Sequence, residues 1–220
     1  MKNFRFKHII WDWNGTMLDD VFLCCDIMNN ILRRRNMQPI TLSQYRDIFT
    51  FPVREYYKNV GLPLDNGNFE KLSVEFIDEY ESRKNNCSLY PGVKETLEYF
   101  YSMGLGQSVL SAYSQHTLVE IIEHFGLSRY FQKINGLDNI YAAGKIDNGR
   151  KWIKELGLKK GEVLLIGDSV HDYEVAEEIG AASVLISTGH QAETKLKKVT
   201  QNVYPSMNSF LLELQNLKKY

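Results

Sequence analysis

The chain has 220 residues, a formal net charge of −1 and 44% hydrophobic residues, which suffices for one large domain or a domain with a smaller insert. The balance of acidic and basic residues argues against nucleic acid or an anionic membrane as a partner, and no apolar stretch approaches the ~18 residues of a membrane-spanning helix. The three cysteines are odd in number and lack metal-ligand spacing, which indicates reduced thiols in a cytoplasmic protein.

The first predicted element is a buried strand at 6–11, which leads directly into Asp12. Asp12 opens a turn with the sequence Asp-Trp-Asn-Gly-Thr. A carboxylate at the end of a buried strand is suited to chemistry, although a single aspartate there is more often a turn residue or a helix cap. Two residues later, Asn14 occupies the position where an acid/base partner of Asp12 is expected.

Residues 19–88 interrupt the alternation of strands and helices that characterises the rest of the chain. Between 20 and 35, apolar residues recur at the spacing of an amphipathic helix. Thr41 to Gln44 has the form of a capping box that opens a second helix, and further helices are predicted at 53–60 and 69–84. We therefore expect a helical cap at 19–88, inserted into a core that comprises 1–18 and 89–220.

The second half of the chain alternates strands with helices. Apolar runs typical of buried strands lie at 107–110, 162–166 and 182–186. Helical patterns lie at 93–103, 115–125, 148–156 and 173–179, and several end at a glycine, a common helix stop. This alternation predicts the α/β class, with a doubly wound parallel sheet.

Polar side chains follow the predicted strands at the edge where open α/β sheets bind ligands. Ser111 follows the strand at 107–110, Asp168 and Asp172 follow the strand at 162–166, and Lys145 lies in a loop before a helix. With Asp12 they provide what phosphoryl transfer requires: a nucleophilic carboxylate, oxygen ligands for Mg²⁺, and a hydroxyl and an ammonium for the phosphoryl oxygens. The prediction depends on their shared placement, because each residue alone has a structural explanation.

These motifs resemble those of the haloacid dehalogenase-like hydrolases, and in particular the phosphoglycolate-phosphatase-like branch with a helical cap. Residues 12–16 resemble the motif Asp-x-Asp-Gly-Thr, and 167–172 resemble Gly-Asp-Ser-x-x-Asp. Ser111 and Lys145 match two shorter motifs of the family. The resemblance spans residues 6 to about 189 and implies a Mg²⁺-dependent phosphatase with a Rossmann-like core, acting on a small phosphorylated metabolite such as a phosphoglycolate-like phosphomonoester.

The resemblance also implies roles for single residues. Asp12 would form an aspartyl-phosphate, with Asn14 in place of the usual acid/base aspartate. The implied Mg²⁺ ligands are Asp12, Asp168, Asp172 and Asn14 through its backbone carbonyl. The residues expected to bind the phosphate or the rest of the substrate are Ser111, Lys145, Trp13, Gly15, Thr16 and Ala112. Apart from the resemblance, Arg54 is a candidate for binding a substrate carboxylate or a second phosphate, because the planar guanidinium suits such groups.

The amide of Asn14 can neither donate nor accept a proton near neutral pH, and loss of a positioned acid/base typically costs ~10²–10⁴-fold in rate. Leaving groups that need a proton should suffer most, and aryl or acyl phosphates least. His171 and Asp19 are candidates for a replacement base because each neighbours a motif.

Three alternatives remain beside a phosphatase. A carbon–phosphorus hydrolase similar to the phosphonoacetaldehyde-cleaving members also carries a non-acidic residue at this position, and it would use a cap lysine, here Lys58, as a Schiff base. A dehalogenase is disfavoured by the phosphate-type motifs and Asp168. The third alternative is a catalytically weak protein that binds phosphate or a metabolite.

Overall fold

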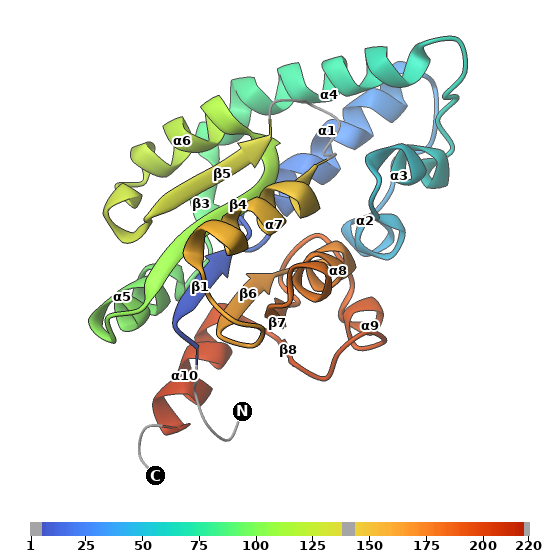
Figure 1. Ribbon diagram of the computed structural model, residues 1–220. Coiled ribbons are helices and arrows are strands. Elements are labelled where there is room, and N and C mark those ends of the chain that lie inside the picture. Colours follow the sequence, from blue (N-terminus) through green and yellow to red (C-terminus); the bar gives the residue numbers. More distant parts are fainter. Residues whose placement is uncertain (1–5, 138–143, 218–220) are drawn as a thin grey trace.

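The computed structural model describes residues 6–137 and 144–217 (Figure 1). Its main sheet, within these residues, has six parallel strands in the order β5-β4-β1-β6-β7-β8. The strands are β1 His8–Trp11, β4 Gly106–Ser114, β5 Lys133–Leu137, β6 Val163–Gly167, β7 Ala182–Ile186 and β8 Val203–Tyr204. The predicted doubly wound α/β class is confirmed. The sequence analysis missed β5 and β8, because β5 interrupts its apolar residues with Asn135 and Gly136 and β8 has only two residues.

Helices cover both faces of the sheet. α5 (Val93–Ser102) and α10 (Met207–Leu217) pack on one face, α7 (Lys145–Leu156) and α8 (Val170–Ile179) pack on the other, and α6 (Gln115–His124) packs beside β4 and β5. Side chains alternate between the faces along β1, as in any strand: Trp11 lies against Phe100 of α5, whereas Ile10 belongs to the cluster around Trp152 of α7. The middle of the sheet is therefore buried on both sides, and it holds Asp12, which directly follows β1, in a fixed position.

Two helices begin earlier than the sequence predicts. α7 begins at Lys145 rather than at 148, after Gly144 with a φ of 115°. α8 begins at Val170 rather than at 173, and its N-cap Ser169 forms a capping box with Asp172. Both first turns are largely polar, so apolar periodicity did not reveal them. Lys145 and Asp172 therefore lie in the first turns of their helices, at the carboxyl edge of the sheet.

The segment between 19 and 88 leaves and rejoins the core through a two-stranded antiparallel ladder, β2 (Leu18–Asp19) with β3 (Ser88–Leu89). It contains α1 (Val21–Arg34), α2 (Leu42–Ile48), α3 (Val53–Val60) and α4 (Asn68–Arg83), followed by a short 3₁₀ helix at Lys84–Asn86. Figure 1 shows α1 and α4 side by side, with α2 and α3 below them in this view. The predicted capping box is present, since Thr41 and Gln44 bond each other's backbone amides.

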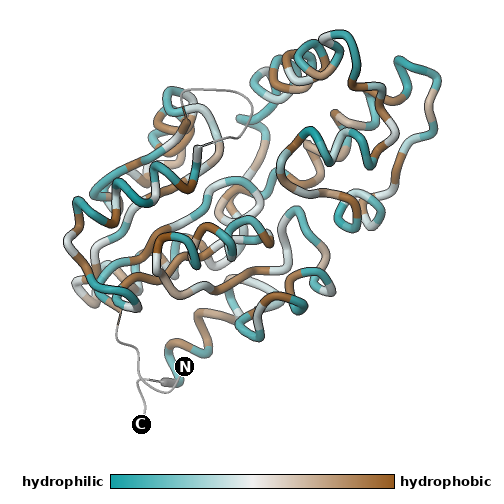
Figure 2. The backbone as a smooth tube through the Cα atoms, turned by 45° about the vertical axis from the view of Figure 1, so that its right-hand side comes forward, coloured by the Kyte–Doolittle hydropathy of each residue, from teal (hydrophilic) through white to brown (hydrophobic). Residues whose placement is uncertain are grey.

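Most helices are amphipathic, and Figure 2 shows hydrophilic and hydrophobic stretches alternating along them. On α1 the apolar face is buried, while Arg34 and Arg35 near its end form ion pairs with Glu75 of α4 at 2.7 and 2.6 Å. This arginine run therefore joins two cap helices. Among the described helices, none has the length and apolar character needed to cross a membrane.

Candidate active site

Three buried carboxylates and one buried lysine meet at the carboxyl edge of the sheet. Lys145 Nζ lies 2.5 Å from Asp12 Oδ1 and 2.6 Å from Asp172 Oδ1. The Thr16 hydroxyl lies 3.0 Å from Asp168 Oδ1 and 3.2 Å from Asp12 Oδ2. The structure thus brings together residues from β1, β6, α7 and α8, in the arrangement that strand-end placement predicted.

The turn after β1 is shaped by close contacts that only glycine allows. Gly15 has a φ of 72°, which L side chains rarely adopt. A Cβ at this position would lie 2.4 Å from a ring carbon of His190 and 2.6 Å from Asp168 Oδ2. Asp12 itself continues the sheet, because its amide donates to the Ile166 carbonyl at 2.9 Å. The nucleophile candidate therefore sits on a rigid strand end rather than on a free loop.

The charges of this group do not balance within the protein. Burial, with a further contribution from the neighbouring carboxylates, raises the pKa of Asp12 to about 8 despite the opposing effect of Lys145. Burial likewise raises the pKa of Asp168 to about 6. Oxygen atoms of Asp12, Asp168 and Asp172 lie within 4.8 Å of one another. Three carboxylates beside one ammonium leave an excess of negative charge, which fits a divalent cation that prefers oxygen ligands.

Asp172 differs from the other two carboxylates because protein donors occupy both of its oxygens. Oδ1 accepts from Lys145, and Oδ2 accepts from the Ser169 amide at 3.0 Å and the Ser169 hydroxyl at 2.6 Å. Burial alone would raise the pKa of Asp172, but Lys145 outweighs it and lowers the pKa. Both oxygens of Asp172 thus already accept hydrogen bonds, and the residue holds the Lys145 ammonium beside Asp12.

Asn14 does not stand alone at the acid/base position. Its amide nitrogen donates to Asp20 Oδ2 at 2.8 Å and to the Tyr80 hydroxyl at 2.7 Å, and Tyr80 in turn donates to the same Asp20 oxygen at 2.8 Å. A carboxylate at position 14 would face a second carboxylate at this distance. The neutral amide and the acid at position 20 therefore form a matched pair.

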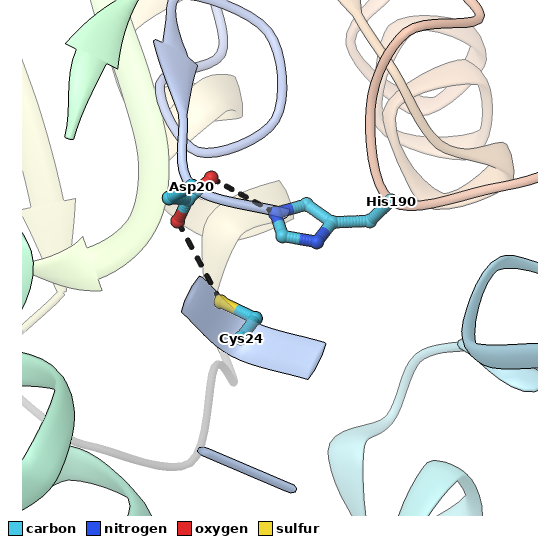
Figure 3. A group of neighbouring side chains, drawn as sticks. All are labelled: Asp20, Cys24 and His190. Carbon is cyan, nitrogen blue, oxygen red and sulfur yellow. Dashed lines mark hydrogen bonds and ion pairs between the residues drawn. The ribbon is translucent and has the colours of Figure 1, made fainter. Parts of the chain in front are cut away.

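Asp20 also forms a buried ion pair with His190, shown in Figure 3. His190 Nε2 lies 3.2 Å from Asp20 Oδ1, and His190 Nδ1 lies 2.8 Å from the Tyr45 hydroxyl. Burial alone would lower the pKa of His190, but Asp20, with further contributions from Asp168 and Asp12, raises the pKa to about 9. The Gly15 amide and the Cys24 thiol also donate to Asp20. The two oxygens of Asp20 thus have five protein donors, so the hydrogen-bonding capacity of this carboxylate is satisfied by the protein itself.

The sequence analysis did not assign Asp20 or His190 to the site. It treated Asp20 only as the first residue of a cap helix, whereas the residue is the N-cap of α1 and makes no side-chain capping bond. His190 lies four residues after the end of β7. The rule that singled out the residues after β1 and β6 could therefore have singled out His190 as well.

The other predicted binding residues are only partly brought together. Ser111 and Ala112 line the cavity above Asp12, although Ser111 lies within β4 at an irregularity in its pairing rather than after the strand. Trp13 is fully buried against Phe125 and does not line that cavity. Arg54 is exposed, donates to the Leu64 carbonyl and lines a separate depression.

The two candidate replacement bases, His171 and Asp19, and the candidate Schiff-base lysine, Lys58, lie outside the described lining of the cavity. His171 packs against the Phe51 ring, with centroids 4.8 Å apart, and lies 3.6 Å from Glu174. Asp19 is part of the β2 strand. The Lys58 side chain is 71% exposed and pairs with Glu55. The structure therefore places none of these three side chains beside Asp12.

The sequence model of the haloacid dehalogenase-like hydrolases matches residues 9–186. The chain belongs to this family. It is 25% identical to a phosphoglycolate phosphatase of Rhodobacter capsulatus, over 83% of this chain and 85% of the relative. It is 24% identical to an N-acetylmuramic acid 6-phosphate phosphatase of Pseudomonas aeruginosa, over 86% and 85%. These relatives agree with the enzyme class expected from the motifs, a phosphatase.

Solved structures show the same fold at lower sequence identity. A haloacid dehalogenase-like family hydrolase from Streptococcus pneumoniae has a TM-score of 0.81 at 16% identity, covering 96% of this chain and 99% of its own. A predicted phosphatase from Clostridium acetobutylicum has a TM-score of 0.78 at 19% identity, with the same coverage. These similarities extend over the helical segment as well as the core, so this haloacid dehalogenase-like hydrolase shares its whole architecture with them.

Proposed function

We propose that this hydrolase is a Mg²⁺-dependent phosphatase of the cytoplasm that hydrolyses a small phosphorylated metabolite through an aspartyl-phosphate on Asp12. The observation that carries the proposal is the position of Lys145, whose ammonium lies between Asp12 and Asp172 in a cluster with excess negative charge. Phosphoryl transfer needs a nucleophile, a cation and charge stabilisation at one point. The relatives named as phosphatases support the same activity.

The residues present can be assigned to the steps of such a reaction. Asp12 attacks phosphorus, and the leaving oxygen departs with the bonding electrons. Lys145 and Ser111 bind the phosphoryl oxygens, on which the transition-state charge is spread. Asp12, Asp168 and the Asn14 carbonyl would hold the Mg²⁺ ion, which supplies positive charge to the phosphoryl group. Asp172 is a positioning residue, because it acts through Lys145.

Asn14 limits both halves of the reaction. Its amide cannot protonate a departing alkoxide, so leaving groups that are stable as anions are favoured in the first step. It also cannot activate the water that must cleave the aspartyl-phosphate. The second step is therefore slow whatever the substrate, and the phosphorylated enzyme should accumulate.

The geometry favours this proposal over a carbon–phosphorus hydrolase. That reaction needs a free lysine amine for a Schiff base, and amines form Schiff bases only when unprotonated. Within the described part of the cavity the lysine is Lys145, which is held as a cation because Asp12 and Asp172 outweigh burial and raise its pKa.

The proposal is tested by phosphate release from phenyl phosphate, measured with Mg²⁺ and again with excess EDTA. We expect release only with Mg²⁺, and a loss of ~10³-fold or more in Asp12→Asn, as for removal of other nucleophiles. Asp78→Asn, an exposed aspartate of α4, is the matched control and should keep the wild-type rate. Equal rates for Asp12→Asn and the wild type would reject the proposal.

A further inference from the structure

The wall opposite the carboxylates is strongly apolar and comes from the helical segment. We infer that, within the phosphatase function proposed above, the substrate is the phosphate ester of a small, uncharged, largely apolar leaving group, best an aryl phosphate, and that carboxylate-bearing esters such as phosphoglycolate are disfavoured. This inference rests on the proposed function and departs from the substrate in the relatives' names. It depends on four features of the cavity.

The first feature is the lining. The cavity that contains Asp12 and Lys145 is bounded by the loop after α2, by α3 and by α4. Figure 1 shows where these elements lie. These elements contribute, among others, Phe49, Phe51, Val53, Tyr56, Phe76 and Ile77. The cavity volume is about 160 Å³, close to the ~150 Å³ of an apolar protein cavity that accommodates benzene. Its size and its apolar lining therefore suit a small apolar group such as a single ring.

The second feature is that three of the tyrosine hydroxyls around the cavity are already in use. Tyr45 bonds His190, Tyr80 donates to Asp20, and Tyr113 donates to a cap glutamate. These tyrosines present rings to a ligand and keep their hydroxyls for the protein. Tyr56 differs, because its buried hydroxyl has no partner among the described residues and is available for one polar atom of a ligand.

The third feature is the absence of a free cation in the described lining. Its basic side chains are Lys145, which pairs with two carboxylates, and His190, which pairs with Asp20. Asp20 itself accepts hydrogen bonds from Asn14 and Tyr80 and lies 3.2 Å from His190, so neither member of this pair is free for a ligand. A substrate carboxylate would meet this paired group and an apolar wall. Burial of an unpaired charge is strongly unfavourable.

The fourth feature is Asn14. An enzyme that cannot protonate the leaving oxygen needs an alcohol that departs as a stable anion. Phenols meet this requirement, because their pKa is ~10, far below that of alkyl alcohols. The chemistry at Asn14 and the shape of the cavity are independent observations, and both indicate an aryl group.

The direct test compares benzyl phosphate with phosphoglycolate, which carry a phenyl ring and a carboxylate on the same –CH₂–O–phosphate unit. We expect kcat/KM at least tenfold higher for benzyl phosphate, a difference of ~1.4 kcal/mol. Phenyl phosphate should be faster again, because its leaving group needs no proton. Equal or better turnover of phosphoglycolate would overturn the inference.

A charge placed in the wall should reverse this preference. Ile77→Arg puts a cation on the cavity side of α4 at a half-buried position. It should raise kcat/KM for phosphoglycolate and lower it for benzyl phosphate. Val74→Arg, on the same helix but 48% exposed, is the matched control and should leave the ratio unchanged. The same shift in both variants would show that general charge, and not the cavity wall, sets the preference, and would also overturn the inference.

Binding separates this inference from the proposed activity. Benzylphosphonate and phosphonoacetate differ only in phenyl against carboxylate and carry no hydrolysable ester bond. With Mg²⁺ present, calorimetry should show benzylphosphonate binding at least tenfold more tightly. That order, together with no hydrolysis of any ester, would reject the phosphatase and retain the apolar, uncharged ligand class. The opposite order would overturn the inference whatever the enzyme hydrolyses.

Discussion

At residue 14 the protein carries an amide where the proposed mechanism would use an acid, and the neighbouring Asp20 supplies a physical reason. The two side chains are 2.8 Å apart. Two carboxylates this close cannot both ionise, so one of them takes a strongly raised pKa. Asn14 is therefore adapted to Asp20 and is not simply an isolated loss of function.

Because of this coupling, we expect acid/base function at position 14 to be gained only when residues 14 and 20 are changed together. Asn14→Asp alone should lower the free energy of unfolding by ~1.5–3 kcal/mol, the value of a hydrogen bond to a charged group, and should gain little activity. The double variant Asn14→Asp with Asp20→Asn keeps an amide opposite a carboxylate. It should hydrolyse benzyl phosphate at least ~10²-fold faster than the wild type. Urea unfolding and steady-state kinetics measure both effects, and additive behaviour of the two changes would contradict the coupling.

The pair of Asp20 and His190 predicts a pH dependence of stability. Burial lowers the pKa of His190, but Asp20, with further contributions from Asp168 and Asp12, raises it from 6.5 to about 9 in the folded state. The resulting stabilisation is complete below about pH 6.5 and is lost as the pH rises through about 9. In EDTA, the difference in unfolding free energy between wild type and His190→Gln should shrink over this interval. A difference that is constant from pH 6 to pH 10 would contradict the ion pair.

Single residues also show what the sequence could reveal about the site. Asp12, Lys145 and Asp168 were predicted because motif spacing and strand ends are local properties. Tyr80 was missed because its role arises from contact with Asp20, 60 positions away along the chain. His190 was missed although it follows a strand end, because its partners Asp20 and Tyr45 are more than 100 positions away and no motif marks it. Arg54 illustrates the converse, since a plausible charge near the start of a cap helix turned out to face the Leu64 carbonyl.

At the scale of elements, α2 is fixed to the loop after β7 by several polar contacts. Arg46 of α2 donates to the Thr188 and Gly189 carbonyls at 2.7 and 3.0 Å. The carbonyl of Phe49, directly after α2, accepts from Gln191 and Lys195 at 3.0 Å each. These bonds hold the apolar wall over Asp12, so we expect them to control access to the cavity.

Arg46→Ala should therefore loosen the wall without unfolding the protein. We expect faster amide hydrogen exchange at 42–49 and 188–192 and a several-fold higher KM for phenyl phosphate, because two charge-assisted hydrogen bonds are lost. Arg33→Ala is the control, since this exposed arginine of α1 bonds only within its own helix among the described contacts. Similar exchange in both variants would mean that α2 is held mainly by its aromatic packing.

At the scale of the whole molecule, the sequence predicted the overall architecture better than the starts and ends of its helices and strands. Long apolar runs revealed the central strands, and amphipathic spacing revealed the helical insert. The edge strands β5 and β8 and the ladder β2–β3 were not predicted, because strands this short or this polar carry little periodic signal. The cavity arises where the helical layer meets the core, so its aromatic lining depends on contacts that no local pattern encodes.

The most direct test of the account is to trap the covalent intermediate. Wild-type enzyme with Mg²⁺ and phenyl phosphate should be quenched in acid within the first turnovers, and its peptides examined by mass spectrometry. The account predicts near-stoichiometric phosphorylation of the peptide that contains Asp12, because Asn14 leaves the second step without a base. Release of phosphate with no phosphoryl group on that peptide, or with the group on another residue, would contradict the central claim that Asp12 is the nucleophile.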